Sequence, residues 1–221
     1  MAQRVTYLEI GSYRGGSLQP HVLDPLCRHI VSIDPRPPVQ EDESGLAFAY
    51  PGNSARRMLE ALAAMAPDGV GKIRTFEHGV SDMRPDAFDE PPVLCFIDGE
   101  HTDDALWSDF WYCHRSLAGN GLIVCHDAPI LYNGLVAIRD EIARRRLACR
   151  MAYLPDTIVA FEFGDAGLLD HPDVLACRAD AADGYLFSLQ STDHYRRIAR
   201  RWPIRTYRRL RAWWAGSREA D

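Results

Sequence analysis

The sequence lacks three patterns that would each have pointed to a particular class of protein. Its six cysteines include no Cys-x-x-Cys pair, so neither a zinc site nor a disulfide framework is indicated. No apolar run reaches the length of a membrane-spanning helix. No Gly-x-Gly-x-x-Gly fingerprint occurs, which disfavours a dinucleotide-dependent oxidoreductase. We therefore expect a globular protein whose thiols are free and mostly buried, as is typical of a reducing compartment.

A secretory signal is not predicted either. Residues 1–6 lead directly into an apolar, strand-like run, and we expect a cytoplasmic location. With 221 residues, the chain has the size of one domain, or of one domain with a tail. A chain of this length buries enough apolar surface to fold without disulfides or metal staples.

Charge is distributed unevenly along the chain. Residues 195–221 hold nine arginines against Glu219 and Asp221, a balance of +7, whereas the whole chain carries −6. The remaining residues therefore carry −13. Because so acidic a body would repel phosphates, nucleic acid is an unfavourable main ligand.

The N-terminal stretch predicts a strand, a tight turn and a helix. Residues 5–10 are apolar and β-prone, a glycine-rich turn begins at Gly11, and a helical pattern covers residues 17–29. Such a turn is where an open α/β sheet holds a nucleotide-like ligand, because glycines let the backbone approach it closely. The next strand, residues 29–33, leads into Asp34, which suits the two hydroxyls of a ribose.

Strands and helices continue to alternate along the chain, as in a βαβ fold. Further strands are predicted at 73–77, 93–97 and 122–125, helices at 55–66, 102–117 and 131–146, and two last strands at 149–154 and 157–163. Only two residues separate the last two strands, so they must form an antiparallel hairpin. The loops 36–52 and 82–92 are candidate lids over the site or, equally, ordinary connections.

We accordingly predict an α/β fold: a doubly wound, mostly parallel Rossmann-like sheet that ends in an antiparallel hairpin, followed by a basic helical C-terminal tail. The predicted divisions are a ligand-binding domain over 1–164, an unassigned extension over 165–194, and a basic, aromatic, amphipathic tail over 195–221.

Polar side chains end the predicted strands. Glu9, Asp34, Asp98 and the pair His126–Asp127 all follow apolar runs, and the carboxyl ends of parallel strands meet at one edge of a sheet. The carboxylates of Asp98 and Asp127 together with the imidazole of His126 suit a divalent ion, Mg²⁺ or Mn²⁺. Taken singly, these residues also fit ordinary helix caps or a buried core histidine.

His101 lies three residues after Asp98, close to the predicted metal site. An imidazole titrates near neutral pH, so it suits the removal of a proton from an acceptor hydroxyl. A surface position in the first turn of the following helix is the alternative.

Three motifs carry a resemblance to a known family. Residues 9–17, Glu-Ile-Gly-Ser-Tyr-Arg-Gly-Gly-Ser, resemble the first motif of class I S-adenosylmethionine (SAM) methyltransferases, in the form found in metal-dependent, catechol O-methyltransferase-like enzymes. Residues 97–102 and 121–128 are similar to a bacterial group that includes cephalosporin hydroxylase-like and rhamnosyl O-methyltransferase-like enzymes. The resemblance implies a SAM-dependent O-methyltransferase, with divalent-metal assistance, acting on a hydroxyl of a small-molecule or sugar/natural-product acceptor.

The resemblance also assigns roles to individual residues. SAM would be held by residues of the first motif, of the second strand end and of the turn after the third strand: Glu9, Gly11, Ser12, Tyr13, Gly15, Ser17, Asp34, Ser81 and Asp98. Asp98 and His101 would be catalytic, His101 standing where the catechol-type enzymes have a lysine base. His126 is a departure, because an acidic residue is commoner there.

Two features leave alternatives open. Only four residues precede the first strand, so the site would be covered by another part of the chain or by a partner subunit of a homo-oligomer, or would be open to a large acceptor.

Arginines alternate with large aromatic residues over 195–214, which suits peripheral contact with an anionic membrane. RNA and packing against the acidic body are rival roles for this tail. A non-catalytic methyltransferase-fold scaffold docked at a membrane is therefore a second hypothesis.

Overall fold

The structure, a computed structural model, describes residues 5–85, 88, 90–155, 157–178 and 206. The chain divides into a unit of residues 1–182 and a second unit of residues 183–221. The basic tail over 195–221, its proposed membrane contact over 195–214 and much of the extension over 165–194 lie outside the described residues, so these predictions are not tested. Everything that follows concerns the first unit.

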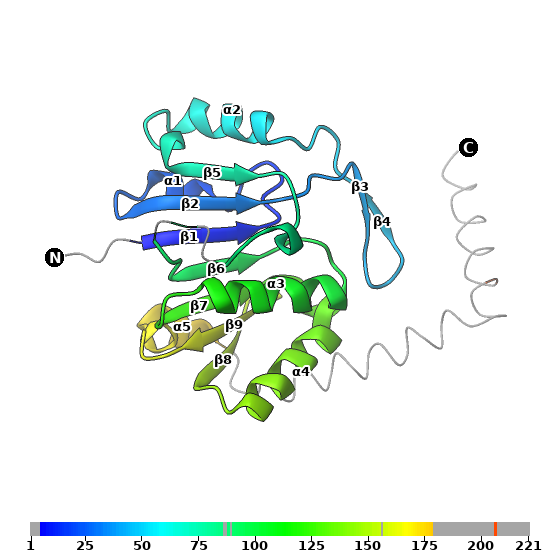
Figure 1. Cartoon of the computed structure of the whole chain (residues 1–221), viewed down its shortest axis with the longest axis vertical. Coiled ribbons are helices and arrows are strands. Elements are labelled where there is room, and N and C mark those ends of the chain that lie inside the picture. Colours follow the sequence, from blue (N-terminus) through cyan, green and yellow to red (C-terminus); the bar gives the residue numbers. More distant parts are fainter. Residues whose placement is uncertain (1–4, 86–87, 89, 156, 179–205, 207–221) are drawn as a thin grey trace. The chain divides into compact units, whose positions relative to one another are not determined.

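A seven-stranded sheet forms the centre of this unit, with the order β5-β2-β1-β6-β7-β9-β8 (Figure 1). Pairing is parallel from β5 to β7 and antiparallel where β9 meets β7 and β8. The predicted doubly wound sheet with an antiparallel end is therefore confirmed. The strands in chain order are β1 (Val5–Ile10), β2 (Cys27–Ile33), β5 (Ile73–Phe76), β6 (Leu94–Ile97), β7 (Gly121–Cys125), β8 (Cys149–Leu154) and β9 (Ile158–Phe163).

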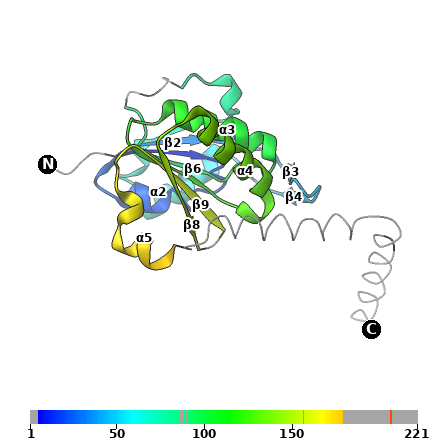
Figure 2. The same cartoon turned by 90° about the horizontal axis from the view of Figure 1, so that it is seen from below.

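Helices cover both faces of the sheet (Figure 2). On one face, α3 (Asp103–Ser116) and α4 (Ala128–Arg145) pack together, and Phe110 of α3 contacts Phe161 of β9 edge to face. The other face is covered by α1 (Gln19–Leu23), α2 (Ala55–Met65) and α5 (Pro172–Cys177). Burial of both faces explains why the central strands read as continuous apolar runs.

Local sequence signals set the start of two helices. The Ser54 hydroxyl accepts a hydrogen bond from the Arg57 N–H and begins α2, and the Thr102 hydroxyl does the same for α3 with Ala105. Each cap satisfies one of the N–H groups that a helix leaves free at its N-terminus.

The predicted helix over 17–29 was wrong in length, because α1 ends at Leu23 and β2 already begins at Cys27. Pro25 disfavours helical geometry at the residue before it, and the Asp24 carboxylate accepts the Leu26 N–H in a local turn. The chain therefore turns at 24–26 and enters the second strand early.

Two further boundaries differ from expectation. The loop over 36–52 contains a two-stranded antiparallel hairpin, β3 (Val39–Glu41) and β4 (Ala47–Ala49). Helix α4 begins at Ala128 rather than 131, since Pro129 is well suited to the first turn of a helix. Leu131 marks a kink inside it.

The remaining elements are short. Single 3₁₀ turns lie at Val70–Lys72, Val80–Asp82 and Leu168–Asp170, so part of the extension after residue 164 is regular structure. All six cysteines are free thiols and four are buried, as predicted, but Cys177 is exposed. Among the helices that the structure describes, none is both long and apolar enough to cross a bilayer.

Gly11 fixes the approach of the β1 turn to the end of β6. Its φ of +87° is a conformation that L side chains rarely adopt, and a Cβ there would overlap the carbonyl group of Asp98. No flexible side chain can move aside, because the overlapping atoms belong to the backbone of the turn that follows β6.

We expect Gly11→Ala to lower the free energy of unfolding by about 2–4 kcal/mol, through combined strain and overlap. Urea denaturation followed by circular dichroism measures this change. Gly16→Ala is the matched control, because Gly16 lies in the same turn and a Cβ there meets nothing within 4 Å. It should change stability by less than about 1 kcal/mol. Equal effects of both substitutions would contradict the role given to Gly11.

Candidate active site

A cavity of about 230 Å³ lies at the carboxyl ends of the parallel strands. Five residues that the sequence predicts for cofactor binding line it: Gly11, Tyr13, Asp34, Ser81 and Asp98. They come from the turn after β1, the ends of β2 and β6, and the turn after β5. Residues far apart in the sequence thus meet in one cavity, as parallel strands require.

Glu9, Ser12, Gly15 and Ser17, also predicted to bind the cofactor, are not among the residues that line this cavity. Glu9 is fully buried and accepts hydrogen bonds from the Tyr7 hydroxyl at 2.6 Å and the Ser17 hydroxyl at 2.8 Å. The bond from Ser17 ties β1 to the segment that leads into α1 and so helps to hold the glycine-rich turn in place. A direct role for these four residues in cofactor binding stays a prediction.

Burial governs the ionisation of Glu9. It raises the pKa of this carboxyl to about 7, although hydrogen bonds from Tyr7 and Ser17 favour the charged form. A carboxylate that exchanges its hydration for two hydroxyl donors still loses solvation free energy, which explains the direction of the change.

Asp34 is held in a fixed orientation. Its carboxylate accepts hydrogen bonds from the Tyr13 N–H at 2.9 Å and the Arg36 N–H at 2.8 Å. The Arg36 guanidinium lies 3.7 Å from it and donates to the Tyr13 carbonyl and the Asn53 side chain. A carboxylate can accept about four hydrogen bonds, so Asp34 retains capacity for the hydroxyls of a ligand in the cavity.

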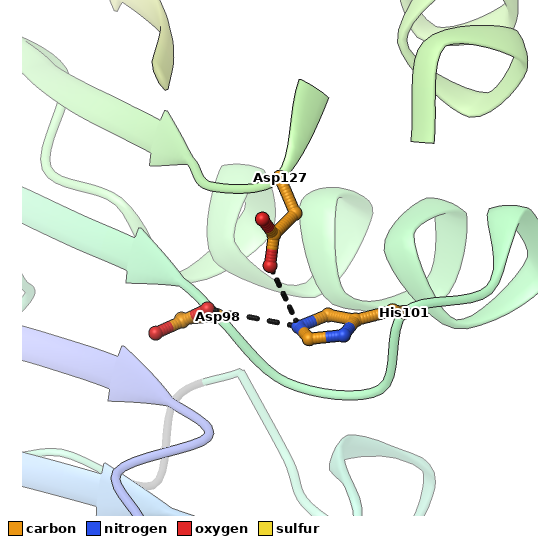
Figure 3. Close-up of side chains that lie close together, drawn as sticks. All are labelled: Asp98, His101 and Asp127. Carbon is orange, nitrogen blue, oxygen red and sulfur yellow. Dashed lines mark ion pairs between the residues drawn. The ribbon is translucent and has the colours of Figure 1, made fainter. Parts of the chain in front are cut away.

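The metal-ligand candidates meet at the ends of β6 and β7. Asp98 follows β6, Asp127 follows β7, and His101 points toward both from the loop before α3 (Figure 3). The His101 Nε2 lies 3.0 Å from an Asp127 oxygen and 3.8 Å from an Asp98 oxygen. The His126 Nδ1 lies 3.2 Å from Asp98 and 3.1 Å from Asp127. We call these four residues the two-aspartate, two-histidine cluster.

Opposite charges dominate the electrostatics of this cluster. Hydrogen bonding to Asp127 and Asp98 raises the pKa of His101 to about 9 and that of His126 to about 10. The same contacts hold the pKa of Asp127 below its usual range. Burial opposes the ionisation of Asp98, but the two imidazoles outweigh it and its pKa is also lowered. The cluster therefore favours two carboxylates facing positive charge.

The structure groups ligand atoms somewhat differently from the predicted set. Asp98, His101 and Asp127 each offer one donor atom within 4.8 Å of the others, so His101, predicted as a base, also has the position of a ligand. Asp127 adopts a left-handed backbone with φ of +55°, which turns the chain from β7 into α4. Strained backbone of this kind is common at functional sites.

Sequence reasoning missed several residues that line the cavity. Gln40 and Tyr50 come from the β3–β4 segment, Asn53 precedes α2, and Asp109 comes from α3. The pKa of Tyr50 is raised by partial burial and then by the charges of Asp98 and Asp127. Asp109 carried a readable signal, since the residues three and four positions to either side of it on the helix are apolar or aromatic, and an acidic residue among them is unusual.

Asp109 is buried, with 8% of its surface exposed. Burial, and secondarily the charge of Glu100, raises the pKa of its carboxyl to about 7. Its protonation therefore changes in the physiological range.

The sheet order and the cavity at the carboxyl ends define a Rossmann-like methyltransferase fold. A family model described as a methyltransferase domain matches residues 8–128, more than half of the chain. The chain therefore belongs to the methyltransferase domain family, and it is an enzyme. A sequence search against curated proteins finds no match.

Several solved structures with a similar fold are O-methyltransferases. The O-methyltransferase NovP is 14% identical, with a TM-score of 0.56 over 73% of this chain and 72% of that chain. CalS11, a TDP-rhamnose 3′-O-methyltransferase of calicheamicin biosynthesis, is 16% identical, with a TM-score of 0.52 over 73% and 72%. TomG from Streptomyces achromogenes, in complex with SAM, is 14% identical, with a TM-score of 0.51 over 73% and 74%.

A buried carboxyl with a raised pKa makes stability depend on pH. Below a pH of about 4, Asp109 is protonated in both states; as pH rises toward 7, only the unfolded chain ionises, and stability is lost. We expect Asp109→Asn to remove this loss. The melting temperature of the variant minus that of wild type should be roughly 5 °C larger at pH 8 than at pH 5.

Differential scanning calorimetry at several pH values provides the measurement. Asp104→Asn is the control, because Asp104 is exposed on the same helix. Its difference from wild type should stay constant over this range. If the melting temperatures of Asp109→Asn and wild type also differ by a constant amount from pH 5 to pH 8, the pKa of Asp109 is not raised and the prediction is wrong.

Proposed function

We propose that this methyltransferase uses SAM and a divalent metal ion, Mg²⁺ or Mn²⁺, to methylate a hydroxyl of a small-molecule or sugar acceptor. The observation that carries the proposal is the convergence of Asp34, Asp98 and Asp127. All three lie at strand ends, Asp34 and Asp98 line the cavity, and Asp98 and Asp127 share their neighbouring imidazoles.

The cavity suits a nucleoside-containing cofactor. Asp34 has free acceptor capacity for ribose hydroxyls, and the Gly11 turn lets the backbone come close to the ligand. Ser81 and Asp98, which are also predicted to bind the cofactor, line the same cavity. The SAM bound to TomG supports the choice of cofactor.

The two-aspartate, two-histidine cluster fits a divalent ion. Carboxylate oxygens with one imidazole nitrogen form a donor set that Mn²⁺ accepts readily and Mg²⁺ tolerates. The His126 Nδ1 is buried without a hydrogen bond of regular geometry, although two carboxylates lie within 3.2 Å of it. We propose Asp98, Asp127 and His126 as the ligands. When bound, the ion supplies Lewis-acid polarisation of the acceptor hydroxyl.

His101 is proposed as the general base. With a pKa of about 9 it carries a proton at neutral pH, because two carboxylates face it. A base must be unprotonated, so the negative charge of Asp98 and Asp127 has to be balanced by another cation. A metal ligand set that includes both carboxylates meets this condition, and the imidazole can then take the hydroxyl proton.

The proposed class of methyl acceptor is based on the acceptors of O-methyltransferases with a similar fold. CalS11 acts on TDP-rhamnose, and TomG takes part in tomaymycin synthesis. We propose a sugar or natural-product hydroxyl for this chain on the same pattern, with positioning of the nucleophile as the enzyme's main contribution to the rate.

Titration calorimetry with SAM tests the cofactor. We expect wild type to bind and Asp34→Asn to bind about 10-fold more weakly, because an amide is a poorer acceptor for ribose hydroxyls. Glu60→Gln, an exposed change on α2, should bind like wild type. Absence of SAM binding to wild type would refute the proposed function.

Mn²⁺ titration, followed by electron paramagnetic resonance, tests the metal. Asp98→Asn and Asp127→Asn should each weaken Mn²⁺ binding by at least about 100-fold, since a charged ligand is lost. Asp165→Asn, an exposed acidic residue elsewhere, is the matched control. Mn²⁺ binding that is indifferent to all three substitutions would remove the metal from the proposal.

The two histidines are separated by their different readouts. His126→Gln should weaken Mn²⁺ binding, whereas His101→Gln should leave it nearly unchanged and slow methyl transfer by about 100-fold. Transfer is measured with methyl-labelled SAM and a panel of hydroxyl acceptors that begins with TDP-rhamnose and catechol. The reverse pattern would exchange the roles of ligand and base.

A further inference from the structure

Asp109 is a buried acidic residue that neither the fold nor the two-aspartate, two-histidine cluster uses. Only 8% of its surface is exposed, yet it lines the cavity. Among the described residues it has no hydrogen-bond or ion-pair partner. Its carboxyl lines the cavity, where a ligand can serve as its hydrogen-bond partner.

The surroundings place Asp109 at a defined part of the cavity. Helix α3 packs against the 3₁₀ turn Val80–Asp82, and one helical turn after Asp109 the Tyr112 hydroxyl lies 3.4 Å from the Arg84 carbonyl. A Cβ added to Gly99 would be 3.4 Å from the Asp109 carboxylate. The carboxyl therefore lies where α3 meets the turns after β5 and β6.

Its chemistry suits one edge of a heteroaromatic base. Burial raises the pKa of this carboxyl to about 7, so at neutral pH it is available as a carboxylic acid. An acid offers an O–H donor and a C=O acceptor side by side. A 6-aminopurine presents the complementary pair, a ring-nitrogen acceptor at N1 beside the donor amine on C6.

We propose that Asp109 is a specificity-determining residue for the cofactor, and that its carboxyl hydrogen-bonds the amine-bearing edge of the adenine ring. This inference rests on the proposed use of SAM. It explains why an acidic group occurs on the cavity side of α3, where an apolar residue would cost less free energy. It also gives the cavity a group that distinguishes an aminopurine from other bases.

The test compares two ligands on three proteins by titration calorimetry. The ligands are S-adenosylhomocysteine and its analogue with hydrogen in place of the 6-amino group. We expect wild type to bind the analogue at least about 10-fold more weakly, the loss expected when a buried hydrogen bond goes unmade. Asp109→Leu should weaken S-adenosylhomocysteine binding by a similar factor and change analogue binding by less than about 3-fold. Asp109→Asn, which keeps a donor and an acceptor, should retain most of the discrimination.

Each outcome decides the proposal. Equal weakening of both ligands by Asp109→Leu would assign Asp109 a purely structural role and overturn it. Wild type that binds both ligands equally well overturns it without any variant, which covers the case in which Asp109→Leu does not fold. Asp34→Asn should weaken both ligands alike, so cofactor binding is tested separately. If wild type binds neither ligand, the proposed function fails together with this inference.

Discussion

The close approach of two backbone turns is the constraint on which the site depends. The Gly11 turn after β1 lies against the carbonyl of Asp98 at the end of β6, with no room for a side chain between them. Because β1 and β6 are adjacent parallel strands, this contact brings the cofactor turn next to the two-aspartate, two-histidine cluster. In the proposed reaction a methyl donor and an acceptor hydroxyl must be aligned closely, and this contact would fix the distance between the two proposed binding sites.

Charge balance is the second constraint. Three aspartates at one sheet edge would repel one another, and each faces groups that offset its negative charge. Arg36 and two backbone N–H groups stabilise Asp34, whereas His101 and His126 stabilise Asp98 and Asp127. Asp109 has no such partner, and its ionisation is suppressed instead. The cavity thus combines ionised and ionisable carboxyls, which suits a ligand with both a cationic centre and a neutral base.

The β3–β4 hairpin and its flanking residues form part of the cavity wall, which no sequence motif predicted. Its Glu43 N–H donates to the His101 carbonyl at 2.7 Å, and the Glu43 carboxylate accepts from the Asp103 N–H at 3.0 Å. These contacts fasten the hairpin to the turn that carries the proposed base. Three large apolar side chains of this segment remain exposed, Val39, Leu46 and Phe48. A loop predicted as a lid is thus an ordered element at the edge of the site (Figure 1).

The sequence by itself determined the alternation of the main strands and helices and the acidic residues at strand ends, and the capping hydroxyls of Ser54 and Thr102 are local signals of the same kind. These features are local: apolar period, capping hydroxyls and the chemistry that follows a strand are all readable within a few residues. Helix α1 was overestimated, since the turn at 24–26 outweighed a helical pattern.

Only the tertiary structure decided which polar groups face the cavity. Glu9 and Ser17 turn inward to bond with each other, while Asp109, hidden in a helix, reaches the ligand cavity. It also brought His101 as near to the Asp127 carboxylate as His126 is. Side-chain direction depends on how the turns cross the ends of neighbouring strands, and this geometry arises from contacts between residues distant in the chain.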